Sequence, residues 1–146
     1  MAPLNSQSKL GLASRFTVEI DGYDLGGWAK CSGLEVDFQL EEYVELGNNS
    51  FTYQLPKGAK YKNVKLERAC TPQESQQVQT WLNSMIAQPV PGTASITLHD
   101  AWKNEVLTWT LTGVFPARWV GPTFDANSHE MAMEALELSH VGFLEG

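Results

Sequence analysis

A long run of alternating residues between Leu34 and Leu46 constrains this chain more than any other feature. Apolar side chains occupy most of its even positions, and its odd positions are mostly acidic or polar. A period of two is typical of a β-strand with one buried and one solvated face, because a helix would spread these apolar residues around its axis. The solvated face would carry the carboxylates of Glu35, Asp37, Glu41 and Glu45.

The composition is that of a soluble, folded protein. The chain has 146 residues, of which 42% are hydrophobic and 18% charged, and this size fits one domain with its own core. We expect a flexible N-terminal arm over 1–13 and a single domain over 14–146.

A net charge of −7 argues against binding of nucleic acid or anionic membranes through bulk charge. The N-terminus has no signal-peptide pattern and no window resembles a membrane span, which predicts cytoplasmic synthesis and no membrane anchor.

Shorter alternating segments predict further strands at 14–21, 28–32, 62–68, 93–99 and 106–115, and turn residues at 21–27 predict a hairpin closure. One helix is predicted at about 72–87. Thr71 can cap it, Pro72 suits its first turn and Glu74 can complete a capping box. An apolar stripe follows at helical spacing, formed by Val78, Trp81, Leu82 and Met85.

The segment 47–61 is apolar, aromatic and interrupted. Pro56 and Gly58 are expected to end any strand ladder there, so we predict a long protruding loop or a loose hairpin. Five of the ten positive residues lie in or just after it: Lys57, Lys60, Lys62, Lys65 and Arg68. Two interpretations stay open: the basic segment pairs with the acidic strand of its own chain, or it meets the acidic strand of another copy.

No constellation for catalysis, metal or cofactor binding stands out. Ser128, His129 and Glu130 are triad residue types, but sequence neighbours do not form the spatial arrangement that a triad needs. The histidines and cysteines lack zinc-ligand spacing, and there is no glycine-rich phosphate loop. Cys31 and Cys70 could form one disulfide, although two reduced, half-buried thiols suit a cytosolic protein better. We therefore expect no enzyme activity and no cofactor.

The segment 128–140 is ambiguous from local pattern. Met, Ala, Glu and Leu favour a helix, and the alternation of apolar residues is imperfect. Local propensity alone therefore leans towards a helix here.

The order of short motifs over residues 14–144 resembles the tail-tube proteins of contractile phages and phage-like extracellular contractile injection systems. In the C-terminal half these motifs are Trp109-Thr-Leu111, Phe115-Pro116-Ala-Arg118, Gly121-Pro122-Thr-Phe124 and Glu134 to Phe143. In the N-terminal half they are Phe16 to Ile20, Cys31 to Glu35, Tyr43 to Glu45, Leu55 to Lys57 and Leu66 to Arg68. The turn after the long strand and the Arg68-Ala69-Cys70 segment depart from the usual pattern.

The resemblance implies a mainly β subunit, sandwich or barrel-like, with one helix, and it implies a strand rather than a helix at 130–140. Such subunits form hexameric rings whose strands line a lumen, and the rings stack into a tube that carries cargo effector or DNA and is driven through a target envelope by sheath contraction. The implied partners are other copies of the chain, a contractile sheath protein, baseplate hub and tube-initiating proteins, and a terminator or cap protein. The particle would be a virion tail or an injection device.

Within this interpretation, two sets of residues are candidates for assembly. The inter-ring stacking loop would comprise Gly47, Asn48, Asn49, Phe51, Tyr53, Leu55, Lys57 and Lys60. The lumen face would include Glu35, Asp37 and Glu41 together with threonine-rich strand faces, because acidic and hydroxyl surfaces repel DNA and offer cargo no apolar grip.

Two alternatives remain. Within the same class, the chain could be a tube-initiating baseplate protein or a type VI secretion tube protein. In a different class, it could be a monomeric β-barrel that lines an internal cavity with aromatic residues and binds a small ligand.

Overall fold

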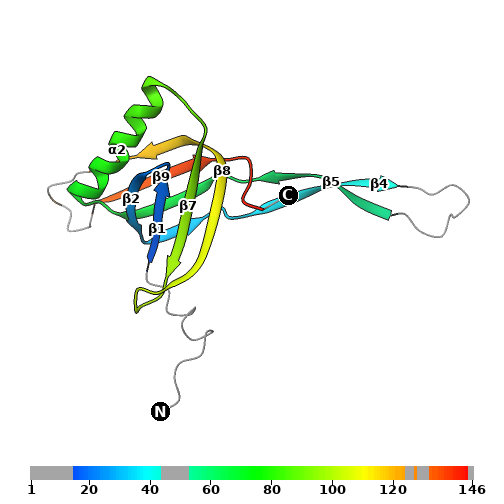
Figure 1. Ribbon diagram of the computed structural model, residues 1–146, viewed down its shortest axis with the longest axis horizontal. Coiled ribbons are helices and arrows are strands. Elements are labelled where there is room, and N and C mark those ends of the chain that lie inside the picture. Colours follow the sequence, from blue (N-terminus) through cyan, green and yellow to red (C-terminus); the bar gives the residue numbers. More distant parts are fainter. Residues whose placement is uncertain (1–14, 44–52, 124–126, 128–131, 145–146) are drawn as a thin grey trace, which may run out of the picture.

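The computed structural model describes residues 15–43, 53–123, 127 and 132–144. Within these ranges the chain is mainly β with one helix, as predicted (Figure 1). The strands are β1 (Arg15–Ile20), β2 (Tyr23–Trp28), β3 (Lys30–Ser32), β4 (Val36–Tyr43), β5 (Tyr53–Tyr61), β6 (Val64–Ala69), β7 (Gly92–His99), β8 (Glu105–Val120) and β9 (Met133–Ser139), and the helix is α2 (Pro72–Ala87).

Seven strands form one antiparallel sheet in the order β2-β1-β7-β8-β9-β6-β3. Its two edge strands, β2 and β3, follow each other in sequence with only Ala29 between them. The N–H of Ala29 donates to the carbonyl of Glu67 on β6 at 3.0 Å, so the chain passes directly from one edge of the sheet to the other. The sheet therefore curls into a barrel-like body, and neither edge is left open along its whole length.

The inward face of this body is filled by apolar side chains at the alternating positions that the sequence marks. Val18 and Ile20 on β1, Ile96 on β7 and Leu111 on β8 are at most 1% exposed. The core also contains Leu25, Trp28, Val64, Leu66, Ala94, Val114, Leu136 and Leu138. These side chains form one apolar core inside the body.

Helix α2 covers one side of the body with the predicted apolar stripe. Val78 and Trp81 are fully buried, and Leu82 and Met85 pack partly buried against the core. The expected capping box is not formed. Thr71 is the N-cap residue but makes no side-chain cap bond, because its hydroxyl donates to Glu74 Oε1 while Glu74 Oε2 accepts from the Gly27 N–H at 3.0 Å. The Glu74 carboxylate therefore links the helix to β2 instead of closing its first turn.

The segment 21–32 differs from its sequence prediction. The hairpin turn is only Asp21-Gly22, both with positive φ, which is the backbone that a two-residue turn between twisted strands requires. Residues predicted as turn therefore form β2, and the predicted strand at 28–32 is divided between the end of β2 and the short β3. Gly33 then turns the chain away with φ +91°, and a Cβ at this position would lie 2.1 Å from the Asn63 carbonyl oxygen.

The strand implied by the family resemblance at 130–140 is confirmed over the part that the structure describes. β9 (Met133–Ser139) pairs with β6 on one side and β8 on the other. Leu136 and Leu138 reach the core only in this extended conformation. Pairing on both edges therefore overrides the helix propensity of this segment.

Cys31 and Cys70 are both free and half-buried. Burial raises the pKa of the Cys31 thiol to about 11, so it stays protonated at pH values where an unfolded cysteine ionises. The unfolded thiol gives up its proton first, and the folded state should therefore lose stability as the pH rises from about 9 towards 11.

Alkylation of Cys31 at pH 9 should be about 50-fold or more slower in the folded protein than in urea, because a pKa near 11 leaves only about 1% thiolate. The rate is measured by mass spectrometry on a Cys70→Ser variant between pH 8 and 10. A Cys31→Ser variant reports Cys70 as the control. A folded-state rate for Cys31 that levels off near pH 9 would contradict the raised pKa.

Candidate assembly surface

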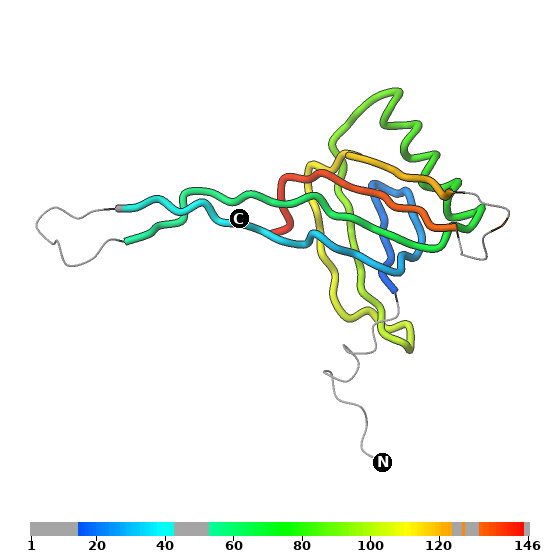
Figure 2. The backbone as a smooth tube through the Cα atoms, turned by 180° about the vertical axis from the view of Figure 1, so that it is seen from behind, coloured from blue at the N-terminus to red at the C-terminus, as the bar shows by residue number. Residues whose placement is uncertain are grey.

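Strands β4 and β5 form a separate two-stranded sheet, the β4–β5 hairpin, which projects far from the body in both views (Figures 1 and 2). Residues 37–42 and 53–60 are all exposed. The alternating strand predicted from the sequence is therefore real over Val36–Tyr43, but the prediction that one of its faces is buried is wrong for the single chain. Alternation shows only that the two faces of a strand differ in polarity. It does not show that the apolar face is buried in the same chain, and here the core of the body is formed by other strands.

One face of the hairpin is apolar from Val36 to Leu40, and Glu42 follows on the same face opposite Gln54. The pairing places Val36 opposite Tyr61, Phe38 opposite Ala59 and Leu40 opposite Pro56. Phe38 is 54% exposed and Leu40 is 56% exposed. An isolated two-stranded hairpin is marginally stable in water, and contiguous exposed apolar surface on a soluble protein marks a contact site. Phe38 and Leu40 on this face are left exposed in the part of the chain that the structure describes.

The other face of the hairpin is polar along β4, where it carries Asp37, Gln39 and Glu41, and it also includes the exposed Leu55 of β5. Asp37 lies opposite Lys60, Gln39 opposite Gly58 and Glu41 opposite Leu55. Acidic and basic residues of the same chain therefore do meet across strands, as one of the two open interpretations of the charge pattern expected.

Pro56 and Gly58 do not end the ladder, contrary to the prediction. The register shifts once, between Gln39 and Leu40, which leaves Lys57 as the extra residue of a bulge. A proline is tolerated because each strand of a two-stranded sheet has one edge without ladder hydrogen bonds.

The base of the hairpin is fixed to the body. Lys62 Nζ lies 2.9 Å from Glu35 Oε2, and the hydrogen bond and charge of Glu35, with the charge of Asp37, raise the pKa of Lys62. The ring of Tyr61 packs edge-on against Phe143 at 5.1 Å and tilted against His140 at 5.5 Å. His140 Nε2 lies 2.9 Å from the Lys62 carbonyl oxygen. These contacts set the direction in which the hairpin leaves the body.

The residues predicted for assembly fall on this hairpin or outside the described residues. Gly47, Asn48, Asn49 and Phe51 lie outside them. Tyr53, Leu55, Lys57 and Lys60 belong to β5, so the part of the predicted loop that is described forms a strand. Among the lumen candidates, Asp37 and Glu41 belong to β4 and Glu35 lies just before it. Sequence reasoning missed Phe38 and Leu40 as surface residues, because their alternation is the same as that of a core strand.

A second surface is rich in hydroxyl groups and lies on the outward side of β1, β7 and β8. Thr17, Thr97 and Thr108 are directly opposite one another across the three strands, and Ser95 lies opposite Thr110 in the next row. The hydroxyls of Thr97 and Thr108 are 3.3 Å apart, and Thr17 Oγ1 lies 2.9 Å from His99 Nε2. This wall is polar and includes charged residues: Glu19 lies opposite Ser95, and Arg15 and Glu105 both lie opposite His99.

A groove of about 710 Å³, the end groove, lies where β6, β8 and β9 meet the first turns of α2. The lining residues that the structure describes come from three segments of the chain and are uncharged: Cys70, Pro72, Ser75, Gln76, Gln79, Trp119, Gly121, Pro122 and Ala132. Beside these segments, Val120 is 43% exposed and Met133 is 50% exposed. The groove is therefore a second exposed surface with apolar character.

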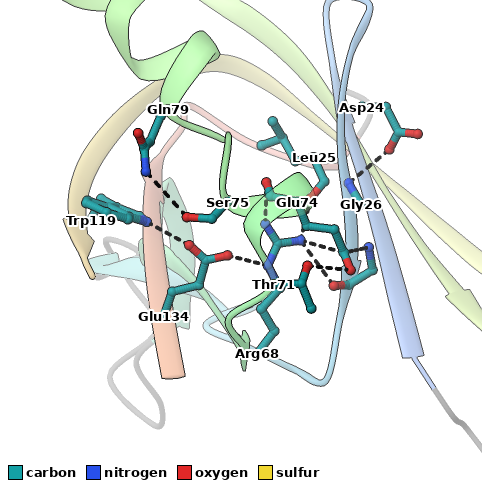
Figure 3. Close-up of polar contacts among 11 residues, drawn as sticks. Asp24, Leu25, Gly26, Arg68, Thr71, Glu74, Ser75, Gln79, Trp119 and Glu134 are labelled. Atoms are coloured by element: carbon teal, nitrogen blue, oxygen red, sulfur yellow. Dashed lines mark hydrogen bonds and ion pairs between the residues drawn. The ribbon is translucent and has the colours of Figure 1, made fainter. Parts of the chain in front are cut away.

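A buried ionic network lies behind the end groove (Figure 3). Arg68 on β6 is 3% exposed, and its guanidinium donates to Glu134 on β9, to the Leu25 carbonyl on β2 and to both the side chain and the carbonyl of Glu74 on α2. Its Cζ also lies 3.8 Å from the centre of the Trp28 ring. Trp119 Nε1, next to the groove, donates to Glu134 Oε2 at 3.2 Å. The guanidinium of Arg68 therefore connects β2, β9 and α2, and Glu134 extends this network to Trp119 in the groove.

Within the described ranges, no group of three or more His, Cys, Asp or Glu side chains could hold a metal ion. Residues 128–130, the candidate triad types, lie outside those ranges. None of the described helices is both long and apolar enough to span a membrane.

Comparisons with known proteins match the chain over almost its whole length. The model of the family described as T4-like virus tail tube protein gp19 matches residues 12–144. No curated protein matches the sequence.

Several solved structures share the fold. A chain of the sheath-tube complex of the PVC extracellular contractile injection system in its extended state is 22% identical, with a TM-score of 0.70 over 94% of this chain and 93% of that one. A chain of the sixfold-symmetrised anti-feeding prophage baseplate is 20% identical, with a TM-score of 0.66 over 97% and 95%. Hcp1 from Salmonella typhimurium is 15% identical, with a TM-score of 0.53 over 88% and 82%.

Proposed function

This chain belongs to the T4-like virus tail tube protein family, and from that membership we propose that it is the repeating subunit of the inner tube of a contractile injection machine. The family match over residues 12–144 is the observation that carries the proposal. Its role is structural rather than enzymatic, since a tube conducts cargo without chemistry and needs no cofactor. The buried apolar side chains that occupy the interior of the body favour this role over a monomeric barrel that binds a small ligand.

The subunits would form hexameric rings that stack head to tail. The exposed β4–β5 hairpin supports this, because a surface that contacts a different surface on the next copy produces an open, self-propagating assembly. In this arrangement the predicted stacking residues, from Gly47 to Lys60, would carry the contact between rings. The apolar face with Phe38 and Leu40 would supply most of the burial.

The lumen would be lined by the hydroxyl-rich wall of β1, β7 and β8, with Glu35, Asp37 and Glu41 on the part contributed by the hairpin. A wall of this kind offers hydrogen bonds that water can replace and, at the carboxylates, repels phosphate groups. It would therefore let cargo effector or DNA slide without strong binding. A lumen with a strongly positive potential in the assembled tube would be incompatible with this arrangement.

The partners of the tube follow from the assemblies in which similar chains were solved. Those assemblies are a sheath-tube complex, a sheath/tube terminator, a baseplate and a cap. We accordingly propose a contractile sheath protein, baseplate hub and tube-initiating proteins, and a terminator or cap protein as partners. The subunit would be made in the cytoplasm and assembled there into a virion tail or an injection particle.

Negative-stain electron microscopy and a mass measurement on the purified protein test the proposal. The expected result is rings or tubes with sixfold symmetry and a mass that is a multiple of six chains. If the protein stays a monomer both alone and on addition of a preformed baseplate, the proposed role is rejected.

A further inference from the structure

The short segment that follows β9 lies between β8 and the base of the β4–β5 hairpin (Figures 1 and 2). We call residues 140–143 the strap. Its backbone is joined to β8, because the Thr112 N–H donates to the Gly142 carbonyl at 3.0 Å and the Val141 N–H donates to the Thr112 carbonyl at 2.9 Å. Two backbone hydrogen bonds therefore fix the strap to one residue of β8.

β8 is irregular at the point where the strap is attached. Thr112 and Gly113 together lie opposite a single residue of β7, Thr93, which makes a bulge in a strand that pairs first with β7 and later with β9. Gly113 has φ +61°, a conformation that favours glycine. A Cβ at Gly113 would lie 2.9 Å from Val141 Cγ2, so a side chain at the bulge would displace the strap.

On its other side the strap contacts the base of the hairpin. The ring of Tyr61 packs on Gly142, where a Cβ would lie 3.1 Å from two ring carbons, and Gly142 has φ +154°. His140 Nε2 donates to the Lys62 carbonyl at 2.9 Å, since a carbonyl oxygen can only accept. The strap therefore has the hairpin on one side and the bulge of β8 on the other.

The ion pair at the base of the hairpin is a weaker anchor. Glu35 and Lys62 flank the hairpin in sequence, so their ion pair joins its two strands to each other rather than to the body. Their side chains are 57% and 58% exposed, and an exposed pair contributes little because solvent screens it. The strap is the better connection for passing a displacement between the body and the hairpin, because backbone hydrogen bonds hold it to β8.

We propose that the strap couples the β4–β5 hairpin to the bulge of β8, so that the freedom of the hairpin to change its angle depends on the conformation of Thr112 and Gly113. The coupling works in both directions. A side chain at Gly113 would displace Val141 and disturb the packing of Tyr61 on the strap, and loss of the Tyr61 ring would weaken the attachment of the strap to β8. The inference goes beyond the proposed function and concerns the single chain.

The coupling reaches the hydroxyl-rich wall as well. Thr108 and Thr110 of this wall line one groove of about 680 Å³ together with Thr112 and with Gly142 and Phe143 of the strap. The threonine side of β8 and the hairpin are therefore joined through one segment of four residues.

Spin labels test the coupling from the side of β8. In a background with Cys31→Ser and Cys70→Ser, labels are attached at Gln39→Cys on the hairpin and at Gln77→Cys on the exposed side of α2. The labelled chain is diluted with unlabelled protein, so that only distances within one chain are measured. Double electron–electron resonance should show a distance distribution about 2-fold or more wider after Gly113→Ala, because the added Cβ displaces the strap.

Two variants serve as matched controls. Gly22→Ala adds a Cβ at another glycine with positive φ, +87°, where no described heavy atom would lie within 4 Å of it. Lys62→Met removes the ion pair but keeps the carbonyl that His140 contacts. Neither should widen the distribution. An unchanged width in a Gly113→Ala protein that is folded by circular dichroism, or an equal widening by Lys62→Met, would overturn the proposal.

Amide hydrogen exchange tests the reverse direction without altering β8. Tyr61→Ala removes the ring that packs on Gly142, and Tyr61→Phe keeps it as the matched control. The Thr112 N–H should exchange about 10-fold or more faster in Tyr61→Ala than in Tyr61→Phe, because its acceptor is the Gly142 carbonyl. The Ile96 N–H, in the middle of the sheet, should exchange equally in both.

Equal exchange of the Thr112 N–H in the two Tyr61 variants would reject the coupling, even if Gly113→Ala failed to fold. Both measurements are made on dilute protein and within one chain, so their outcome does not depend on tube formation. A chain that forms tubes without this coupling retains the proposed function, and a chain that shows the coupling but never assembles retains only the inference about the strap.

Discussion

Replacing Arg68 by Met should lower the free energy of unfolding by about 3–5 kcal/mol, the cost of leaving a buried charge without its partner. The guanidinium is 3% exposed and the Glu134 carboxylate is 1% exposed. Without Arg68, Glu134 would keep only the N–H of Trp119 among its described partners. The Glu74 carboxylate would keep the Gly27 N–H and the Thr71 hydroxyl, and the Leu25 carbonyl would lose the guanidinium. Urea denaturation followed by tryptophan fluorescence and circular dichroism measures the effect.

Lys65→Met is the matched control, because Lys65 lies on the same strand and its ion pair with Glu67 is exposed. It should change the free energy of unfolding by less than about 1 kcal/mol. Adding Glu134→Leu to Arg68→Met should recover part of the loss, since the unpaired charge is then removed as well. A loss below about 1 kcal/mol for Arg68→Met alone would show that the network does not hold the body together.

Phe38→Asp combined with Leu40→Asp should abolish tube formation while leaving the body folded. Burial of each of these side chains contributes about 1.5–3 kcal/mol, so the critical concentration for assembly should rise by about 100-fold or more for each hairpin contact. The urea midpoint should stay within error of the parent, because both residues lie outside the core. Sedimentation over a range of concentrations and electron microscopy measure the assembly.

Gln39→Asp is the control for this pair, since it places the same charge on the opposite face of the same strand. It should leave the critical concentration within about a factor of three of the parent, because an exposed charge on the polar face loses little solvation. If the Phe38→Asp, Leu40→Asp protein still forms full-length tubes, the apolar face of the hairpin is not an assembly surface.

Much of the body could be predicted because there the local pattern and the burial agree. The alternation in β1, β6 and β7 and the helical stripe with Val78 and Trp81 all mark side chains that reach the core. β9 could not be predicted from local pattern, since its two-sided pairing with β6 and β8 outweighs the helix propensity of Met and Leu. The strand at this position was predicted only from the family resemblance.

The candidate assembly surface was predicted less well, for a physical reason. Phe38 and Leu40 have the same spacing as core residues, and a sequence does not say whether an apolar face is covered by its own chain or by another. Arg68 and Glu134 were missed as a pair because they are 66 residues apart and meet only after β6 and β9 have paired. In both cases the deciding partner is distant in sequence.

A helical reconstruction of the assembled protein by cryo-electron microscopy tests the central claim most directly, since it would show both the rings and the position of each hairpin. The account predicts stacked hexameric rings in which the apolar face of every β4–β5 hairpin is buried against a subunit of the neighbouring ring. Tubes in which Phe38 and Leu40 remain exposed to solvent, or hairpins folded back on their own body, would contradict it.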